Sequence, residues 1–179
     1  MKAIIKFSLT FLCLVFIIVS CEKDINSGRM IVKMTCSNDS VPAYEHVYVD
    51  IKQVSINYLG SKQDSWIDLS TDAGIYDLLE LMNDVTIALT DEEKLPIGKV
   101  GQIRLLLGNN NTVVVAGTAF PLKVPSAYTS GVKIVVNQEI RRTQKIIITL
   151  DFDAEQSINQ DNGDFIMNPV IKVKSISYY

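Results

Sequence analysis

Apolar and polar residues alternate with a period of two along most of the chain, which is the pattern of strands that bury one face. The run KIIITLDFD at residues 145–153 is the clearest case, because every second residue from Ile146 to Phe152 is apolar. The alternation predicts strands at residues 29–36, 46–59, 65–69, 102–107, 112–116, 130–136 and 145–153, and a last strand at 171–178. These segments indicate a domain built almost entirely from β-strands.

The alternation slips by one residue in two of the longer segments. In residues 46–59 the phase changes at Lys52–Gln53, and in the last segment it changes at Lys174–Ser175. One extra residue restores each pattern, which predicts a β-bulge at both places. The stretch GNNN at Gly108–Asn111 separates two apolar runs and contains residues that tolerate a positive φ, so it predicts a hairpin turn.

One segment fits either a short helix or a strand. In AGIYDLLELMN, at residues 73–83, the apolar residues lie at helical spacing, although a buried strand fits the same run. The regular spacing of strands and turns, with hardly any helix, predicts an all-β fold. We expect a single antiparallel β-sandwich, immunoglobulin- or transthyretin-like, with at most one or two short helices.

The first residues of the chain differ from the rest. Lys2 and Lys6 precede an unbroken apolar run at Phe7–Val19, which has the length of the hydrophobic region of a secretory signal. The run is shorter than the ~20 apolar residues that a membrane-spanning helix needs. The sequence IVSC at Ile18–Cys21 resembles the lipobox of bacterial lipoproteins. This resemblance implies cleavage before Cys21 and acylation of the new amino-terminal cysteine.

These features divide the chain into a signal peptide at residues 1–20, a lipid-anchored spacer at 21–28 and a β-sandwich domain at 29–179. Loss of Lys2 and Lys6 leaves 15 Lys and Arg against 20 Asp and Glu, so the net charge falls from −3 to about −5. An acidic domain of this kind is not suited to binding nucleic acid. Cys36 is the one cysteine left beside Cys21, so the domain holds no internal disulfide and depends on its core for stability.

The stretches YDLLELMND, LPIGKVGQIRLLL, PLKVPSAYTSGVKI, LDFDAEQSI and NPVIKV follow one another between residues 30 and 175. In this order they resemble the sequence blocks of domain-of-unknown-function family 4382, which consists largely of exported bacterial lipoproteins. The resemblance implies a lipid-anchored β domain at the cell envelope. It implies no activity, substrate or catalytic residue.

Few residues of the domain could carry catalysis. His46 is its one histidine and begins a predicted strand, whereas Cys36 ends another. A nucleophilic pair needs two such groups side by side with a third that orients them. Zinc needs three or four ligands at recognisable spacing. No phosphate-binding glycine loop and no G-x-S-x-G elbow occur. We therefore expect that the protein is not an enzyme and that it has no cofactor, unless calcium binds.

Calcium is considered because four aspartates lie within fourteen residues: Asp151, Asp153, Asp161 and Asp164. Carboxylates suit calcium, although the glycine and glutamate of an EF-hand loop are missing here. The alternative is structural. Asp153 would cap a one-turn helix, with Gln156 reaching back to the Asp153 amide. Asp151, on the polar face of its strand, would pair with a cation such as Arg104.

Trp66 lies between polar residues in a short predicted strand, so an exposed ring there would offer a stacking platform for a sugar. Packing in the core or along a sheet edge is the alternative.

The expected location, the all-β architecture and the lack of a catalytic set favour a lipid-anchored cell-envelope protein. We expect a non-enzymatic binding or adhesion module for a glycan or another envelope protein. The alternative is a periplasmic structural or assembly lipoprotein that pairs with a partner through a sheet edge. In both cases the acyl chains on Cys21 hold the protein in the outer membrane, on its periplasmic side or at the cell surface. A third alternative, a hydrolase, requires a pocket that gathers His46 or the aspartates.

Overall fold

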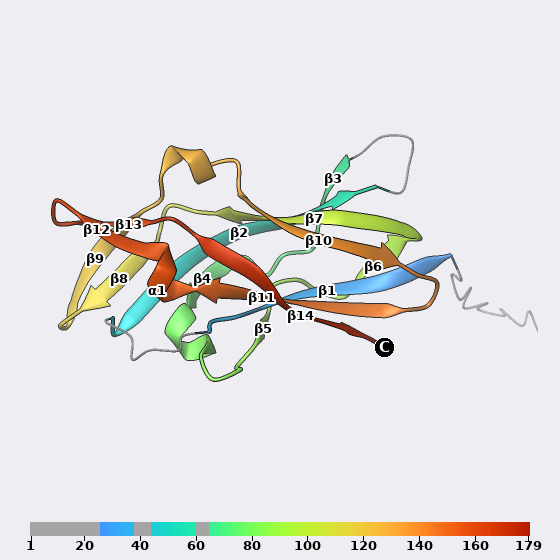
Figure 1. Cartoon of the computed structure of the whole chain (residues 1–179), viewed down its shortest axis with the longest axis horizontal. Helices are drawn as coiled ribbons and strands as arrows, with labels where there is room; N and C mark the ends of the chain where they lie inside the picture. Colours follow the sequence, from blue (N-terminus) through green and yellow to red (C-terminus); the bar gives the residue numbers. More distant parts are fainter. Residues whose placement is uncertain (1–25, 38–43, 60–64) are drawn as a thin grey trace, which may run out of the picture.

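Two β-sheets enclose one hydrophobic core in the computed structural model, which describes residues 26–37, 44–59 and 65–179 (Figure 1). The strands are β1 (Ser27–Thr35), β2 (His46–Tyr58), β3 (Ser65–Asp68), β4 (Gly74–Asp77), β5 (Ile87–Ala88), β6 (Glu93–Pro96), β7 (Gly98–Leu107), β8 (Thr112–Val115), β9 (Thr118–Lys123), β10 (Val132–Ile140), β11 (Lys145–Asp153), β12 (Ile158–Asp161), β13 (Asp164–Met167) and β14 (Val170–Tyr178). The helical segments are the 3-10 helices η1 (Leu78–Leu81) and η2 (Ser126–Tyr128) and the α-helix α1 (Ala154–Ser157). The prediction of an all-β domain with few helices is confirmed.

The two sheets contain both parallel and antiparallel pairs. The smaller sheet has the strand order β14-β11-β1-β5, with β6 also paired to β1. The larger sheet has the order β10-β7-β2-β8-β9-β13-β12, with β3 and β4 also paired to β2. Strands β1 and β11 are parallel, as are β9 and β13. The predicted antiparallel sandwich is therefore confirmed only in part. Most strand pairs are antiparallel, but the long connection between β1 and β11 lets these two strands run in the same direction.

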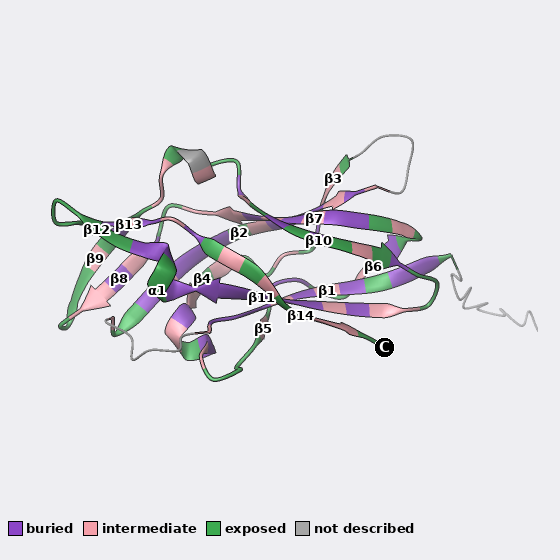
Figure 2. Cartoon of the chain, viewed as in Figure 1, coloured by how far each residue is buried: buried purple, intermediate pink, exposed green. Residues whose placement is uncertain are grey.

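Alternate residues of the central strands fill the core between the sheets (Figure 2). The predicted inward face of β11 is confirmed, since Ile146, Ile148, Leu150 and Phe152 are fully buried, together with Met30, Val32 and Met34 of β1. The larger sheet contributes the opposite side of the core, chiefly from β2 and β7. These residues are Val47, Val49, Ile51, Val54, Ile56, Ile103 and Leu105.

Both predicted bulges are present. The register of β2 against β7 shifts between Ile51 and Gln53. The register of β14 against β11 shifts so that no residue of β11 lies opposite Lys174. The slip in hydrophobic phase therefore marked real changes in pairing, and each bulge keeps apolar residues on the core side of a long strand.

The predicted hairpin at Gly108–Asn111 is wrong. Strands β7 and β8 do not pair with each other, because both run antiparallel to β2, with Leu107 opposite Ile51 and Thr112 opposite Tyr48. The chain thus continues along β2 instead of reversing. Residues 108–111 lie opposite only two residues of β2, Val49 and Asp50, and they fold around the buried Asp50.

The ambiguous segment at residues 73–83 is partly strand and partly helix. Its first half forms β4, which pairs with β2, and its second half forms η1. Asp77 ends the strand and caps η1, because its carboxylate accepts from the amide of Leu79.

The first strand begins two residues earlier than predicted. Ser27 and Gly28 belong to β1 and not to the spacer. A Cβ on Gly28 would lie 2.6 Å from the carbonyl oxygen of Arg141, so close packing accounts for the glycine. The predicted signal peptide, Cys21 and residues 22–25 lie outside the described residues. Among the residues that are described, the helices are too short to cross a bilayer.

Candidate ligand-binding site

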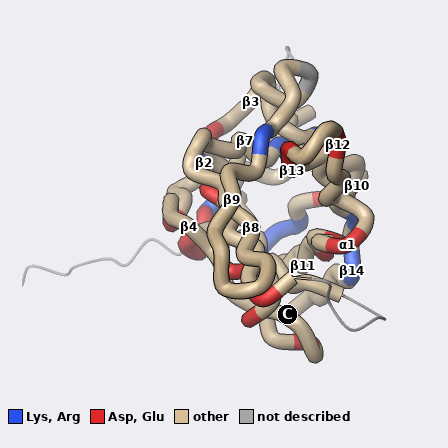
Figure 3. The backbone as a smooth tube through the Cα atoms, turned by 90° about the vertical axis from the view of Figure 1, so that its left-hand side faces the viewer, with Lys and Arg blue, Asp and Glu red and all other residues tan. Residues whose placement is uncertain are grey.

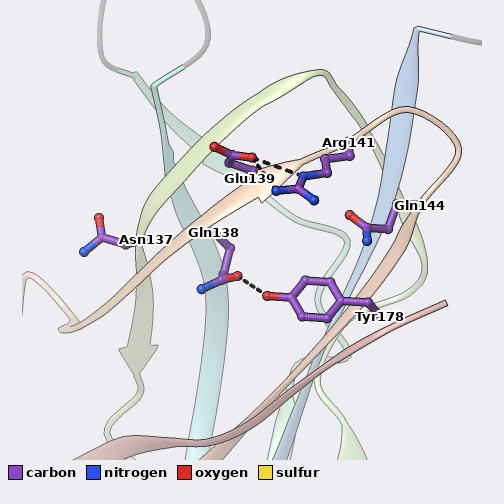
Figure 4. Close-up of a pocket in the computed structure, with 6 residues that line it drawn as sticks. All are labelled: Asn137, Gln138, Glu139, Arg141, Gln144 and Tyr178. Atoms are coloured by element: carbon purple, nitrogen blue, oxygen red, sulfur yellow. Dashed lines mark hydrogen bonds and ion pairs between the residues drawn. The ribbon is translucent and has the colours of Figure 1, made fainter.

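A polar hollow lies between the end of β10 and the end of β14, the outermost strands of the two sheets (Figure 4). Its volume is about 480 Å³. The side chains that line it are Asn137, Gln138, Glu139, Arg141, Gln144 and Tyr178. We call this hollow the seam pocket, because it occupies the seam between the two sheets.

A bulge in β10 directs the lining side chains. The register of β10 against β7 shifts between Val135 and Gln138, and Asn137 has a positive φ of 48°. A bulge bends its strand and re-aims side chains. In Figure 4, Gln138 points toward Tyr178, and the turn after β10 brings Gln144 back toward the same space.

Hydrogen bonds fix most of the lining. The Tyr178 hydroxyl donates to Oε1 of Gln138 at 2.5 Å, and the Arg141 guanidinium donates to the Glu139 carboxylate at 3.0 and 3.1 Å. Among the described residues, Oε1 of Gln144 is buried and has no hydrogen-bond partner. A buried oxygen of this kind costs free energy while it is unpaired.

A second hollow, of about 390 Å³, adjoins the seam pocket. It shares Glu139 and Arg141 with the seam pocket, so this ion pair stands between the two. Its remaining lining is more apolar: Leu59, Ile97, Gly98, Lys99 and Ile140.

The lining of the seam pocket offers several groups that can bind a hydroxyl-rich ligand. Its amides, carboxylate and guanidinium are planar groups that can each bond two neighbouring hydroxyls. The Tyr178 ring adds a flat surface of the kind on which a sugar ring stacks. Among the described residues that line either hollow, none is a serine, cysteine or histidine. His46 and the four aspartates therefore lie elsewhere.

Asp151 is buried and not exposed on a polar face as predicted. Only 1% of its side chain is accessible, and its carboxylate accepts hydrogen bonds from the amide of Ser37 at 2.7 Å and from the Ser37 hydroxyl. Its cation is Lys172 on the neighbouring strand β14, at 3.2 Å. Arg104, the predicted partner, lies on β7 in the other sheet.

Asp153 caps α1, as predicted. Its carboxylate accepts from the backbone amide of Gln156 at 2.9 Å. The Gln156 side chain also donates to this carboxylate, at 2.8 Å, and does not reach back to the Asp153 amide. The buried Ile158 follows α1 and begins β12.

Asp161 and Asp164 face each other across a two-residue hairpin turn. The turn residues Asn162 and Gly163 both have positive φ, as a type I′ turn requires. Asp164 pairs with Lys123 at 2.5 Å. In the described part of the chain, no three His, Cys, Asp or Glu side chains are grouped so that they could hold a metal ion. Calcium binding at these aspartates therefore stays a prediction, which thermal melting with millimolar calcium would test.

Trp66 lies at the edge of the larger sheet, and cations cover its ring. The Arg104 guanidinium lies 4.5 Å from the ring centroid, and Nζ of Lys133 lies 5.9 Å from it. Arg104 also hydrogen-bonds Ser55 at 3.2 Å. A sugar on that face of the ring would have to displace Arg104.

His46 is exposed, whereas Cys36 is buried, although Asp77 acts on both. His46 Nδ1 is 2.5 Å from the Asp77 carboxylate, which also caps η1. Burial, chiefly, raises the pKa of the Cys36 thiol, and the charges of Asp151 and Asp153 raise it further. A thiol with a raised pKa is a poor nucleophile at neutral pH.

The seam pocket was not among the predicted sites. Its signal in the sequence is the polar run NQEIRRTQ at residues 137–144, which directly follows an apolar strand. Such a run is also typical of an ordinary turn. Tyr178 lies far along the chain, so only the fold shows that the two segments meet.

A family model described as Domain of unknown function (DUF4382) matches residues 27–169. The match begins at the first residue of β1 and ends just before β14. Searches among curated proteins and among solved structures found no match.

Proposed function

The chain belongs to the family described as Domain of unknown function (DUF4382), and on that premise we propose its function from the seam pocket. The protein is a lipid-anchored, non-enzymatic cell-envelope protein that binds a hydroxyl-rich glycan there. The observation that carries the proposal is the convergence of Gln138, Arg141, Gln144 and Tyr178 around one hollow.

The anchor rests on the lipobox-like Ile18–Cys21 and the apolar run before it. Labelling cells with radioactive palmitate tests it, in wild type beside Cys21→Ala. We expect label in the wild type and its loss in the variant. Equal labelling of the two proteins would refute acylation at Cys21.

The glycan is tested with the full-length protein in detergent micelles, applied to a panel of immobilised neutral oligosaccharides. We expect wild type to bind at least one member of the panel, and Arg141→Ala to weaken that binding by about tenfold or more, because a charge-assisted hydrogen bond is lost.

The matched control is Arg142→Ala, since Arg142 is adjacent and exposed but does not line the seam pocket. We expect it to bind like wild type. Equal losses in both variants, or a wild type that binds no member of the panel, would contradict the proposal.

The sheet edge β14 supports the alternative of strand pairing less well. Lys172 and Lys174 are exposed along it, and lysines of this kind protect edges from pairing with another chain.

Protease treatment of intact cells distinguishes a domain at the cell surface from one on the periplasmic side of the outer membrane. Digestion of the domain indicates the cell surface, whereas protection indicates the periplasmic side.

A further inference from the structure

The chain enters the fold at the end of the molecule that carries the seam pocket. The backbone oxygen of Asn26 accepts from the amide of Ile97 at 3.3 Å, and its side-chain oxygen accepts from Arg142 at 3.2 Å. The oxygen of Ser27 accepts from the amide of Thr143 at 2.8 Å. In Figure 1, this start of β1 and the carboxyl terminus lie toward the same end.

The predicted acylation site is close to this point in the chain. Cys21 stands five positions before Asn26, and five residues span at most about 18 Å when fully extended. With Cys21 acylated as proposed above, the end that carries Asn26 is held within that distance of the bilayer surface.

The side chains exposed at this end suit a bilayer surface. We call six of them the tether-end face: Ile97, Lys99, Arg141, Arg142, Tyr178 and Tyr179. The exposed Glu139 lies among them and pairs with Arg141. Tyr178 and Tyr179 are 52% and 74% exposed, and Ile97 is 44% exposed. Tyrosine is enriched where a membrane meets water, and Lys and Arg attract phosphate headgroups.

The opposite end of the molecule carries several exposed acidic side chains, one of which, Asp164, pairs with the exposed Lys123. Figure 3 looks onto that end and shows Asp and Glu around α1, β8 and β12. The exposed acidic residues there are Glu45, Glu155, Asp161 and Asp164. The chain as a whole has a net charge of −3, so the cationic side chains of the tether-end face differ in sign from the charge of the whole chain. A charge difference along the long axis orients a molecule on an anionic surface.

We propose that the tether-end face rests on a bilayer surface with anionic phosphate headgroups, so that the seam pocket opens beside the membrane. This inference rests on the proposed acylation of Cys21. Four observations carry it: the entry point of the chain, the short distance to Cys21, the exposed tyrosines and isoleucine, and the charge difference along the molecule.

Spin labels test this orientation in the full-length, acylated protein. One label is placed at Tyr178→Cys and a control label at Thr118→Cys, on the exposed β8–β9 turn at the other end. Acylation blocks Cys21 and burial protects Cys36, so the label reaches the introduced thiol. The protein is reconstituted on vesicles of phosphatidylethanolamine with phosphatidylglycerol, and collisions with oxygen and with a water-soluble nickel complex are compared.

We expect the label at residue 178 to gain oxygen collisions and lose nickel collisions on the vesicles by about twofold or more, while the label at residue 118 stays unchanged. Adding Lys99→Glu and Arg142→Glu to the first variant should reverse its change. If palmitate labels Cys21 but both spin labels remain equally exposed to water, the orientation is wrong and the anchor stands. If palmitate labels neither the wild type nor Cys21→Ala, both the proposed acylation and the proposed orientation are wrong.

Discussion

Asp151 is a charged side chain with 1% exposure, and the protein itself supplies its partners. Ser37 donates two hydrogen bonds to it, whereas Lys172 approaches from the solvent side and is itself 64% exposed. We expect Asp151→Ala to lower the free energy of unfolding by about 2–4 kcal/mol, because the partly buried Ser37 donors lose their acceptor. Urea denaturation measures this change.

Asp161→Ala is the control for Asp151→Ala, since Asp161 is exposed beside a turn. A surface substitution of this kind changes stability by about 0.5 kcal/mol or less. Equal effects of the two variants would show that Asp151 contributes nothing through its burial.

The buried Cys36 thiol gives a prediction about pH. Burial raises its pKa above the ordinary value of 9.0, so the folded protein holds this proton more tightly than the unfolded chain does. Its contribution to stability is therefore complete below pH 9 and is lost as the pH rises through the raised pKa. We expect iodoacetamide at pH 8 to leave Cys36 unmodified in the folded protein and to modify it in urea. Rapid modification without urea would contradict the burial.

Local spacing predicted some residue roles and not others. The cap at Asp153 was predictable, because a cap and its helix lie within four residues of each other. The partners of Asp151 were not, because Ser37 is 114 positions away and Lys172 is placed by the pairing of β14. Arg104 had the right charge but belongs to the other sheet.

At the scale of elements, the stretch Gly108–Asn111 forms a cradle around Asp50. The amide of Gly108 donates to the Asp50 carbonyl at 2.7 Å, and that of Asn110 donates to the Asp50 carboxylate at 3.2 Å. Asn111, which is 3% exposed, accepts from the Asp50 amide at 2.8 Å and donates to the Gly108 carbonyl at 2.7 Å. A Cβ on Gly108 would overlap the Asp50 carboxylate, so this position requires a glycine.

We expect Asn111→Ala to destabilise the protein by about 2–3 kcal/mol, because the buried Asp50 amide and the partly buried Gly108 carbonyl both lose their partner. The midpoint of thermal melting measures the effect. Asn109→Ala is the matched control in the same stretch, since Asn109 is exposed, and it should leave the midpoint nearly unchanged. A similar loss in both variants would mean that the stretch is a plain turn.

The period of two predicted most of the longer strands and both bulges, because each depends on which side chains meet the core. It did not predict the path of the chain at Gly108–Asn111. Glycine and asparagine occur in hairpin turns and also where a backbone closes on a buried group. The difference is made by Asp50, which lies about sixty positions earlier in the sequence.

At the scale of the molecule, both sheets contribute to a single core, so we expect them to unfold together. Trp66 lies in the larger sheet, whereas Asp151 lies in the smaller one. Asp151→Ala should therefore shift the urea transition of Trp66 fluorescence as far as it shifts the transition of far-UV circular dichroism. Two separate transitions would show that the sheets unfold independently.

The seam pocket also belongs to this largest scale. Its polar segment at residues 137–144 was visible in the sequence, but Tyr178 joins it only because β10 and β14 end the two sheets side by side. Composition and spacing therefore predicted the class of fold, whereas the candidate site depends on how the sheets meet.

The parallel pairing of β1 with β11 also sets the order of events during synthesis. Arg29 pairs with Lys145, which the ribosome reaches 116 positions later. At about 5–20 residues per second, this takes roughly 6–23 seconds. During that time β1 presents Met30, Val32 and Met34 without its parallel neighbour, and an unpaired apolar strand invites aggregation. Until β11 arrives, β1 can pair only with β5 and β6, so the strand that is made first completes its pairing among the last.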